Sequence, residues 1–143
     1  MTHRMVAATL GLVGLLMSLY LWLWKVGALG ALACGDGGCE TVQLSPYAYV
    51  FGIPVALLGV VGYLAILVVA LAGLQPRFAA ARWPTDLLLV FAAGGVAFSA
   101  YLTYLEAAVI HAWCRWCIAS AGIIVGIFGA ALAGWVGMRR GRR

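Results

Sequence analysis

Two cysteines, Cys114 and Cys117, form a C-x-x-C pair near the end of the chain. Because residues i and i+3 share one face of a helix, these thiols are close enough to interconvert between a dithiol and a disulfide. The pair stands where a long apolar run begins, and a helix N-terminus stabilises a thiolate, as does the positive charge of Arg115. This pattern predicts redox chemistry at the edge of a bilayer, within reach of a lipid-soluble electron carrier.

A second pair, Cys34 and Cys39, brackets a segment with three glycines, which gives the backbone unusual freedom. Four cysteines allow three pairings: in one of them both disulfides are local, and in the other two the disulfides would tie this segment to the C-x-x-C. Exchange among these pairings would relay electrons between the two pairs. The alternative for Cys34 and Cys39 is a small structural disulfide in an exposed hairpin.

The composition places most of the chain in lipid, since 66% of its 143 residues are hydrophobic and only 9% are charged. A helix needs about 20 apolar residues to cross a bilayer, and four runs meet that length. The first run is too long for a signal-peptide core and is interpreted as a retained span. The sequence therefore predicts an all-α integral membrane protein, a four-helix bundle with a cysteine-containing extracytoplasmic loop after the first helix. The expected spans are 5–26, 49–73, 86–108 and 113–138, within a single domain over 1–143.

Basic residues gather on one side of such a bundle: Arg4, Arg77, Arg82, Arg139, Arg140, Arg142 and Arg143. The positive-inside rule then predicts that both termini and the loop 74–85 are cytoplasmic. All four cysteines fall on the other, extracytoplasmic side, where disulfides persist. This topology also accounts for the net charge of +5, so no nucleic-acid partner is expected.

A longer set of residues carries a family resemblance. Its members, in order along the chain, are Ser45-Pro46, Phe51-Gly52-Ile53-Pro54, Leu58-Gly59, Tyr101-Leu102, Glu106, Cys114-Arg115-Trp116-Cys117 and Ala119-Ser120. In order and spacing it resembles the bacterial branch of the vitamin K epoxide reductase family over nearly the whole chain. The resemblance implies a quinone-dependent enzyme of the cytoplasmic (inner) membrane that forms disulfides, with its active site facing the periplasm.

The resemblance also implies roles for single residues. Cys117 would pass electrons to a quinone, ubiquinone or menaquinone, and Cys114 would exchange with Cys39. Cys34 would meet the dithiol of a partner. The quinone pocket would include Ser45, Phe51, Leu102, Ile110 and Cys117. Because the chain ends at Arg143 without a thioredoxin-like domain, a separate thioredoxin-fold, DsbA-like partner is expected, and no metal.

Ala48 and Ala121 depart from the vertebrate branch, which has an Asn and a Tyr that hydrogen-bond the substrate. Methyl groups cannot supply those bonds, so plain quinone reduction is favoured over epoxide reduction. One alternative is a disulfide generator of the DsbB type, although that type normally carries its C-x-x-C in the first outer loop. An alternative from another class is a thiolate metal carrier or zinc site, since four thiolates can bind zinc tetrahedrally.

The sequence allows two explanations each for Glu106 and for His111. Glu106 either assists proton transfer near the outer face or caps a polar seam between helices. His111 is better explained as a helix-end residue near the headgroups than as a proton carrier. Trp113 and Trp116 fit an aromatic belt at the membrane interface better than a quinone-flanking pair.

Overall fold

The computed structural model describes residues 2–30 and 38–142. Four helices in it are long and apolar enough to cross a membrane: α1 (Thr2–Lys25), α3 (Val55–Leu74), α4 (Trp83–Leu105, continued by the π-helical η3 Glu106–Ile110) and α5 (Arg115–Arg140). Shorter elements connect them: α2 (Gly38–Leu44), the 3-10 turns η1 (Pro46–Ala48) and η2 (Pro76–Phe78), and the strands β1 (Tyr49–Val50) and β2 (Ile53–Pro54). The predicted all-α membrane bundle is confirmed.

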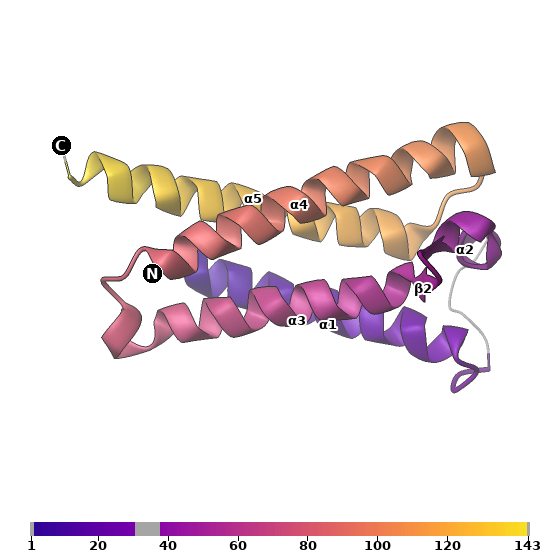
Figure 1. Ribbon diagram of the computed structural model, residues 1–143, viewed down its shortest axis with the longest axis horizontal. Helices are drawn as coiled ribbons and strands as arrows, with labels where there is room; N and C mark the ends of the chain where they lie inside the picture. The colour runs from indigo at the N-terminus through magenta and orange to yellow at the C-terminus, as the bar shows by residue number, and fades with distance from the viewer. Residues whose placement is uncertain (1, 31–37, 143) are drawn as a thin grey trace.

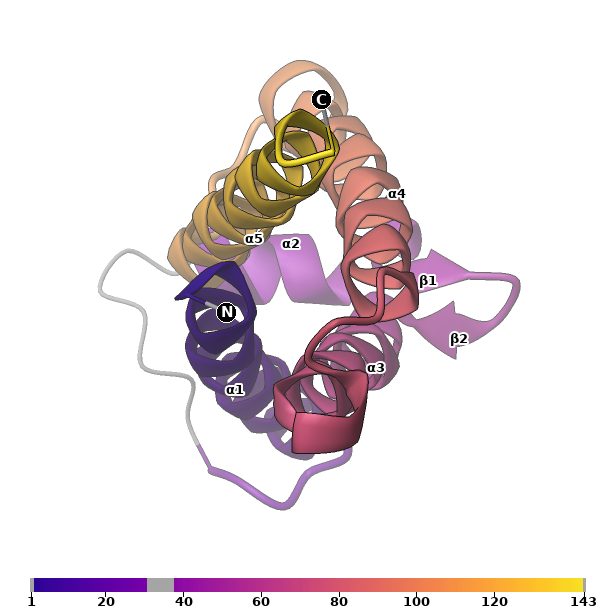
Figure 2. The same cartoon turned by 90° about the vertical axis from the view of Figure 1, so that its left-hand side faces the viewer.

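The four long helices form a ring in which α1 packs on α3, α3 on α4, α4 on α5 and α5 back on α1 (Figure 2). Small residues let the helices approach closely. Ala7, Ala70 and Ala92 are each fully buried in the core with Leu88 and Ile127. Close packing of small side chains is a main source of helix association in lipid, where no water is expelled between helices.

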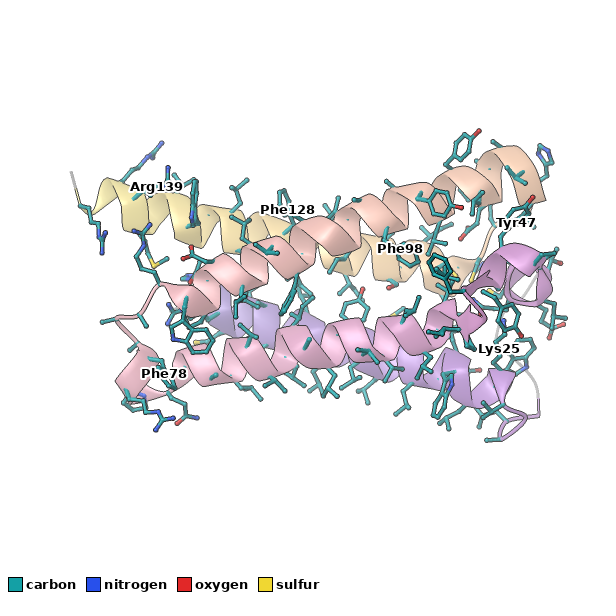
Figure 3. The ribbon with its side chains drawn as sticks, viewed as in Figure 1. Lys25, Tyr47, Phe78, Phe98, Phe128 and Arg139 are labelled. Atoms are coloured by element: carbon teal, nitrogen blue, oxygen red, sulfur yellow. The ribbon has the colours of Figure 1, made fainter. Side chains whose placement is uncertain are left out.

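Both termini and the connection through η2 lie at one end of the bundle, and α2, the hairpin and the start of α5 lie at the other (Figure 1). Figure 3 labels Phe78 and Arg139 at the first end and Lys25 and Tyr47 at the second. The first end therefore holds most of the arginines, and the second holds Cys39, Cys114 and Cys117. Most of the arginines and these three cysteines therefore lie at opposite ends of the bundle, as the sequence predicts.

Arg4, which is 1% exposed, fastens the end of the bundle opposite Cys39, Cys114 and Cys117. Its guanidinium donates to the carbonyl of Gly73 at 2.6 Å and to that of Ala81 at 2.6 Å. It also donates to the hydroxyl of Thr85 at 3.2 Å, and further to the carbonyls of Phe78 and Ala79. One side chain of α1 thus donates hydrogen bonds to backbone carbonyls at the end of α3 and in the turn that follows it, which ties these segments to α1.

The second span begins later than the expected residue 49, because Tyr49–Pro54 forms an antiparallel hairpin. Phe51 and Gly52 make its two-residue turn, and both have positive φ, 52° and 78°. Glycine adopts this conformation without strain, whereas Phe51 does so at a cost. Helix α3 starts directly after Pro54, since the residue before a proline is biased away from helical geometry and proline suits a helix start.

Candidate functional site

Cys114 and Cys117 meet at the first turn of α5. Cys114 is the N-cap residue, and its Sγ accepts a hydrogen bond from the backbone N–H of Cys117 at 3.3 Å. Both are free thiols in the structure. The local geometry that the C-x-x-C spacing predicts is thus present, with the first cysteine capping the helix and the second one turn inside it.

Hydrogen bonding holds the pKa of the Cys114 thiol below its ordinary value. The main cause is the hydrogen bond with the Cys117 thiol; the Cys117 backbone N–H and the Gln43 side chain add to it, while burial and the charge of Glu106 oppose it. Donors directed at a sulfur stabilise its thiolate. A lowered thiol pKa makes Cys114 a better leaving group in thiol–disulfide exchange than an ordinary cysteine.

Cys39 lies on α2 and is disulfide-bonded, while the two helix cysteines are not. Cys39 and Cys114 are both fully buried, and they belong to one packed cluster with Leu21, Val42 and Ala56. Cys34 lies outside the described residues. The short helix α2 thus brings a cysteine that is remote in sequence next to the C-x-x-C, across the open end of the bundle.

A cavity of about 460 Å³ runs between the helices from Cys117 toward the middle of the bundle. Its wall is mostly apolar, with side chains such as Ile66, Phe91, Phe98 and Leu102. Its polar lining residues are Gln43, Glu106 and Cys117 at the cysteine end, together with Ser18, Tyr63, Ser99, Thr103 and Ser120. The hydroxyl of Tyr63 donates to the Ser120 carbonyl at 2.8 Å. The size and the few polar groups suit a drug-sized apolar ligand.

A second, much smaller cavity of about 30 Å³ lies toward the hairpin and η1. Five residues line both cavities: Gln43, Val55, Leu102, Glu106 and Cys117. Cys117 and Glu106 therefore lie where the large cavity meets the small one, at the cysteine end of the bundle.

The expected pocket residues divide between these surfaces. Leu102 and Cys117 line both cavities, and Ser45 and Ile110 line the smaller one. Ser45 donates its hydroxyl to the Val42 carbonyl at 2.7 Å. Phe51 is fully exposed at the hairpin tip and lines neither. The assignment of these residues to quinone binding stays a prediction.

Gln43 is a site residue that sequence reasoning missed. It is 4% exposed, and its Nε2 donates to the Cys117 sulfur at 3.4 Å. Its Oε1 is buried and has no hydrogen-bond partner among the described residues. A buried acceptor without a donor is costly, so a hydroxyl of a bound ligand would satisfy it. Nothing in the sequence marks this glutamine apart from its position four residues after Cys39.

Glu106 is placed by a π-helical turn at the end of α4. The wider turn continues to Ile110, and the chain then reverses at His111, which has φ 57° in the left-handed region. The Glu106 carboxylate accepts a hydrogen bond from the backbone N–H of Cys114 at 3.1 Å. Single π-helical turns are frequent at functional sites because they redirect one side chain.

Trp116 lines the larger cavity and packs on Tyr20 with 5.2 Å between ring centroids, whereas Trp113 is half exposed. Within residues 2–30 and 38–142, no group of three or more His, Cys, Asp or Glu side chains is arranged to hold a metal ion.

Residues 5–132 match the sequence model of the Vitamin K epoxide reductase family. The matched range contains all four cysteines, the whole of α3 and α4, and most of α1 and α5. The resemblance carried by the sequence motifs is therefore confirmed. With the free thiols Cys114 and Cys117 at one end of a four-helix membrane bundle, the chain belongs to the Vitamin K epoxide reductase family and is a membrane thiol–disulfide oxidoreductase.

Proposed function

We propose that this protein couples the oxidation of an extracytoplasmic thioredoxin-fold partner to the reduction of a membrane quinone. Electrons would enter at the loop pair Cys34 and Cys39, pass to Cys114 and Cys117, and leave to the quinone. The protein would sit in the cytoplasmic membrane with both termini inside, so that the cysteine end of the bundle faces the oxidising compartment.

The observation that carries this proposal is the succession of sulfur atoms across one end of the bundle. Cys39 packs in the same buried cluster as Cys114, Cys114 contacts Cys117, and Cys117 lines the large cavity. Each neighbouring pair could exchange a disulfide, and the last sulfur meets a space for an apolar ligand. Such a route links a water-exposed reductant to a lipid-soluble oxidant.

The relay balances in bonds and electrons. A thiolate of the partner attacks Cys34 of the loop disulfide and releases Cys39, which attacks Cys114 of the helix disulfide and releases Cys117. The second partner thiol then frees Cys34, and Cys34 attacks Cys39 to restore the loop disulfide and release Cys114. The partner leaves as a disulfide, and the helix pair holds two electrons as a dithiol.

The low pKa of Cys114 favours this direction of flow. A thiolate that is stabilised in the reduced form makes its disulfide a stronger oxidant. Cys114 is the sulfur that leaves when Cys34 attacks Cys39, and a leaving group of lower pKa leaves faster. Electrons are thus drawn from the loop to the helix pair.

The residues around the large cavity fit a quinone ring. A bound quinone would supply the site with an acceptor for two electrons and two protons. The apolar wall would hold the ring beside Cys117, and the unpaired Gln43 Oε1 would accept a hydrogen bond from a hydroxyl of the reduced product. The Nε2 of Gln43, which donates to Cys117 Sγ, would stabilise charge on that sulfur.

Disulfide mapping of the purified protein tests this proposal. After reaction with a reduced thioredoxin-fold partner and without quinone, Cys114 and Cys117 should accumulate as thiols while the loop disulfide re-forms. Addition of ubiquinone or menaquinone should convert them to a disulfide and yield one quinol per disulfide. Helix thiols that stay reduced with either quinone would contradict the proposal.

Orientation needs its own measurement. After mild reduction, a membrane-impermeant thiol reagent applied to intact cells should label Cys34. Labelling only after permeabilisation would place the cysteine end in the cytosol, where reducing thiol pools would prevent net export of disulfides.

A further inference from the structure

We infer that Glu106 carries a proton from the Cys117 thiol toward the electron acceptor in the large cavity. The inference deepens the proposed function and rests on it. It assigns a chemical role to a buried carboxyl group of the site that thiol exchange alone does not use.

The position of Glu106 supports this role first. Its side chain is 2% exposed, yet it lines both the large cavity and the small outer one, as Cys117 does. Gln43, Val55 and Leu102 share both walls, but none of them ionises near neutral pH. Among the residues common to both cavities, Glu106 is therefore the side chain that can take a proton from Cys117.

The contacts of Glu106 support it next. The carboxyl group lies within hydrogen-bonding reach of the Cys117 thiol. Its Oε2 is held by the Cys114 backbone N–H at 3.1 Å, so the carboxyl is fixed against both cysteines of the pair. A proton acceptor must be within hydrogen-bond reach of the proton it removes, and this geometry satisfies that condition.

Within the described part of the chain, no basic side chain is paired with the Glu106 carboxylate. Arg115 is exposed, and the ammonium group of Lys25 donates to the Gln43 carbonyl. The titratable groups that face Glu106 are Cys114 and Cys117 of α5, Tyr47 on the small cavity and Tyr63 on the large one. A carboxylate buried without a cation lowers its energy by taking up a proton, which is what a proton carrier requires.

The step balances as follows. The Cys114–Cys117 bond forms, two S–H bonds break, and the quinone takes up two electrons and two protons. One proton passes from Cys117 Sγ to the Glu106 carboxylate and on to a quinone oxygen, so Glu106 ends as a carboxylate. The second proton passes through outer water. Cys114 releases its proton to this water, and the quinone takes up one proton from it.

The test compares Glu106→Gln with the wild type, because the carboxamide keeps the acceptor for the Cys114 N–H but cannot carry a proton. Proton carriers of this kind contribute roughly 10²-fold or more to a rate. We expect kcat for quinone reduction to fall by about that factor while the KM for quinone changes little. Glu106→Asp should recover part of the rate. Glu40→Gln, which changes an exposed acid of α2 in the same way, is the matched control and should behave as wild type.

A readout without quinone separates proton transfer from a structural role. The carboxylate can accept a hydrogen bond from Cys117 only in the dithiol form, so its affinity for a proton differs between the two redox forms. By linkage, the slope of the reduction potential of the Cys114–Cys117 pair against pH should then correspond to fewer than one proton taken up per electron in the pH range where Glu106 titrates. Glu106→Gln should restore one proton per electron there.

Each result of these experiments either supports or overturns the role of Glu106 as a proton carrier. An unchanged kcat in Glu106→Gln, or the same pH dependence of the potential in both proteins, would overturn the role of Glu106. If Glu106→Gln fails to fold, Glu106→Asp decides alone: it should keep the wild-type pH dependence, and a loss of that dependence overturns the inference. If the wild type itself reduces no quinone, the proposed function fails, which is a different result.

Discussion

Cys39 of α2 and Cys114 of α5 are both inaccessible to solvent and pack in one cluster, although α3 and α4 separate them in the chain. A buried cysteine that is disulfide-bonded therefore lies beside a buried free thiol with a low pKa. In the proposed relay, exchange between the loop and the helix would take place within this cluster.

Replacement of Cys34 and Cys117 by alanine should trap a disulfide between Cys39 and Cys114. Each remaining cysteine then lacks its local partner, and the other lies in the same cluster. Non-reducing peptide mapping after mild oxidation should recover the 39–114 link. The reciprocal variant, Cys39→Ala with Cys114→Ala, is the control and should give far less of a 34–117 link. Two free thiols at 39 and 114 under oxidation would contradict the relay.

Cys117→Ser should abolish quinone reduction, since the sulfur that lines the cavity is lost and the helix pair can no longer form its disulfide. The loop disulfide should still exchange with a reduced thioredoxin-fold protein. The two activities are followed separately, by quinol absorbance and by mixed-disulfide formation with the partner. Normal quinone turnover in this variant would show that Cys117 is not the last sulfur in the relay.

The low pKa of Cys114 should depend on the side chain at 117. In a background with Cys34 and Cys39 replaced by alanine, Cys114 is the one thiol once residue 117 is changed. Cys117→Ala removes the hydrogen bond that contributes most to the shift, so the pKa of Cys114 should rise; Cys117→Ser keeps a donor and should raise it less. At a given pH below the wild-type value the alanine variant then holds the least thiolate. Ultraviolet absorbance of the thiolate across a pH titration measures this, and identical titrations would contradict it.

Filling the large cavity should weaken quinone binding without affecting the thiols. Gly94 lines the cavity, and a Cβ there would meet no atom within 4 Å, so Gly94→Leu adds bulk without a backbone clash. Loss of about ten atomic contacts at ~0.1–0.2 kcal/mol each would raise the KM for quinone roughly tenfold. Gly129→Leu on α5 also meets open space but lies outside the cavity, and it is the matched control. An unchanged KM in Gly94→Leu would place the quinone elsewhere.

The spans of the bundle were predictable because the bilayer imposes a length and an apolar composition that any window of sequence reveals. The residues at which the spans begin and end were harder to predict. Residues 49–54 are largely apolar and run directly into the helix after them, and the positive φ of Phe51 and Gly52 and the position of Pro54 separate a hairpin from the span. Hydropathy does not carry that information.

The cysteines of the site were predictable from spacing, but their surroundings were not. Helix α2 lies in a segment whose glycines indicate a loop, and it is stabilised by burying Cys39 and Val42 against other helices. Glu106 stood out as a carboxylate in an apolar run. Its contact with Cys114 depends on a π-helical turn, which arises from tertiary packing and has no signature in residue types.

The hydrogen bonds of Arg4 have a mechanical consequence for catalysis. They join α1 to the last turn of α3, to the connection that follows it and to the first turn of α4, at the end of the bundle farthest from the sulfurs. Helices α1, α3 and α4 are thereby joined to one another at the ends that would be cytoplasmic in the proposed orientation. The shifts that disulfide exchange would require then fall on the opposite end of the bundle, where the hydrogen bond between Gln43 and Cys117 joins α2 to the first turn of α5.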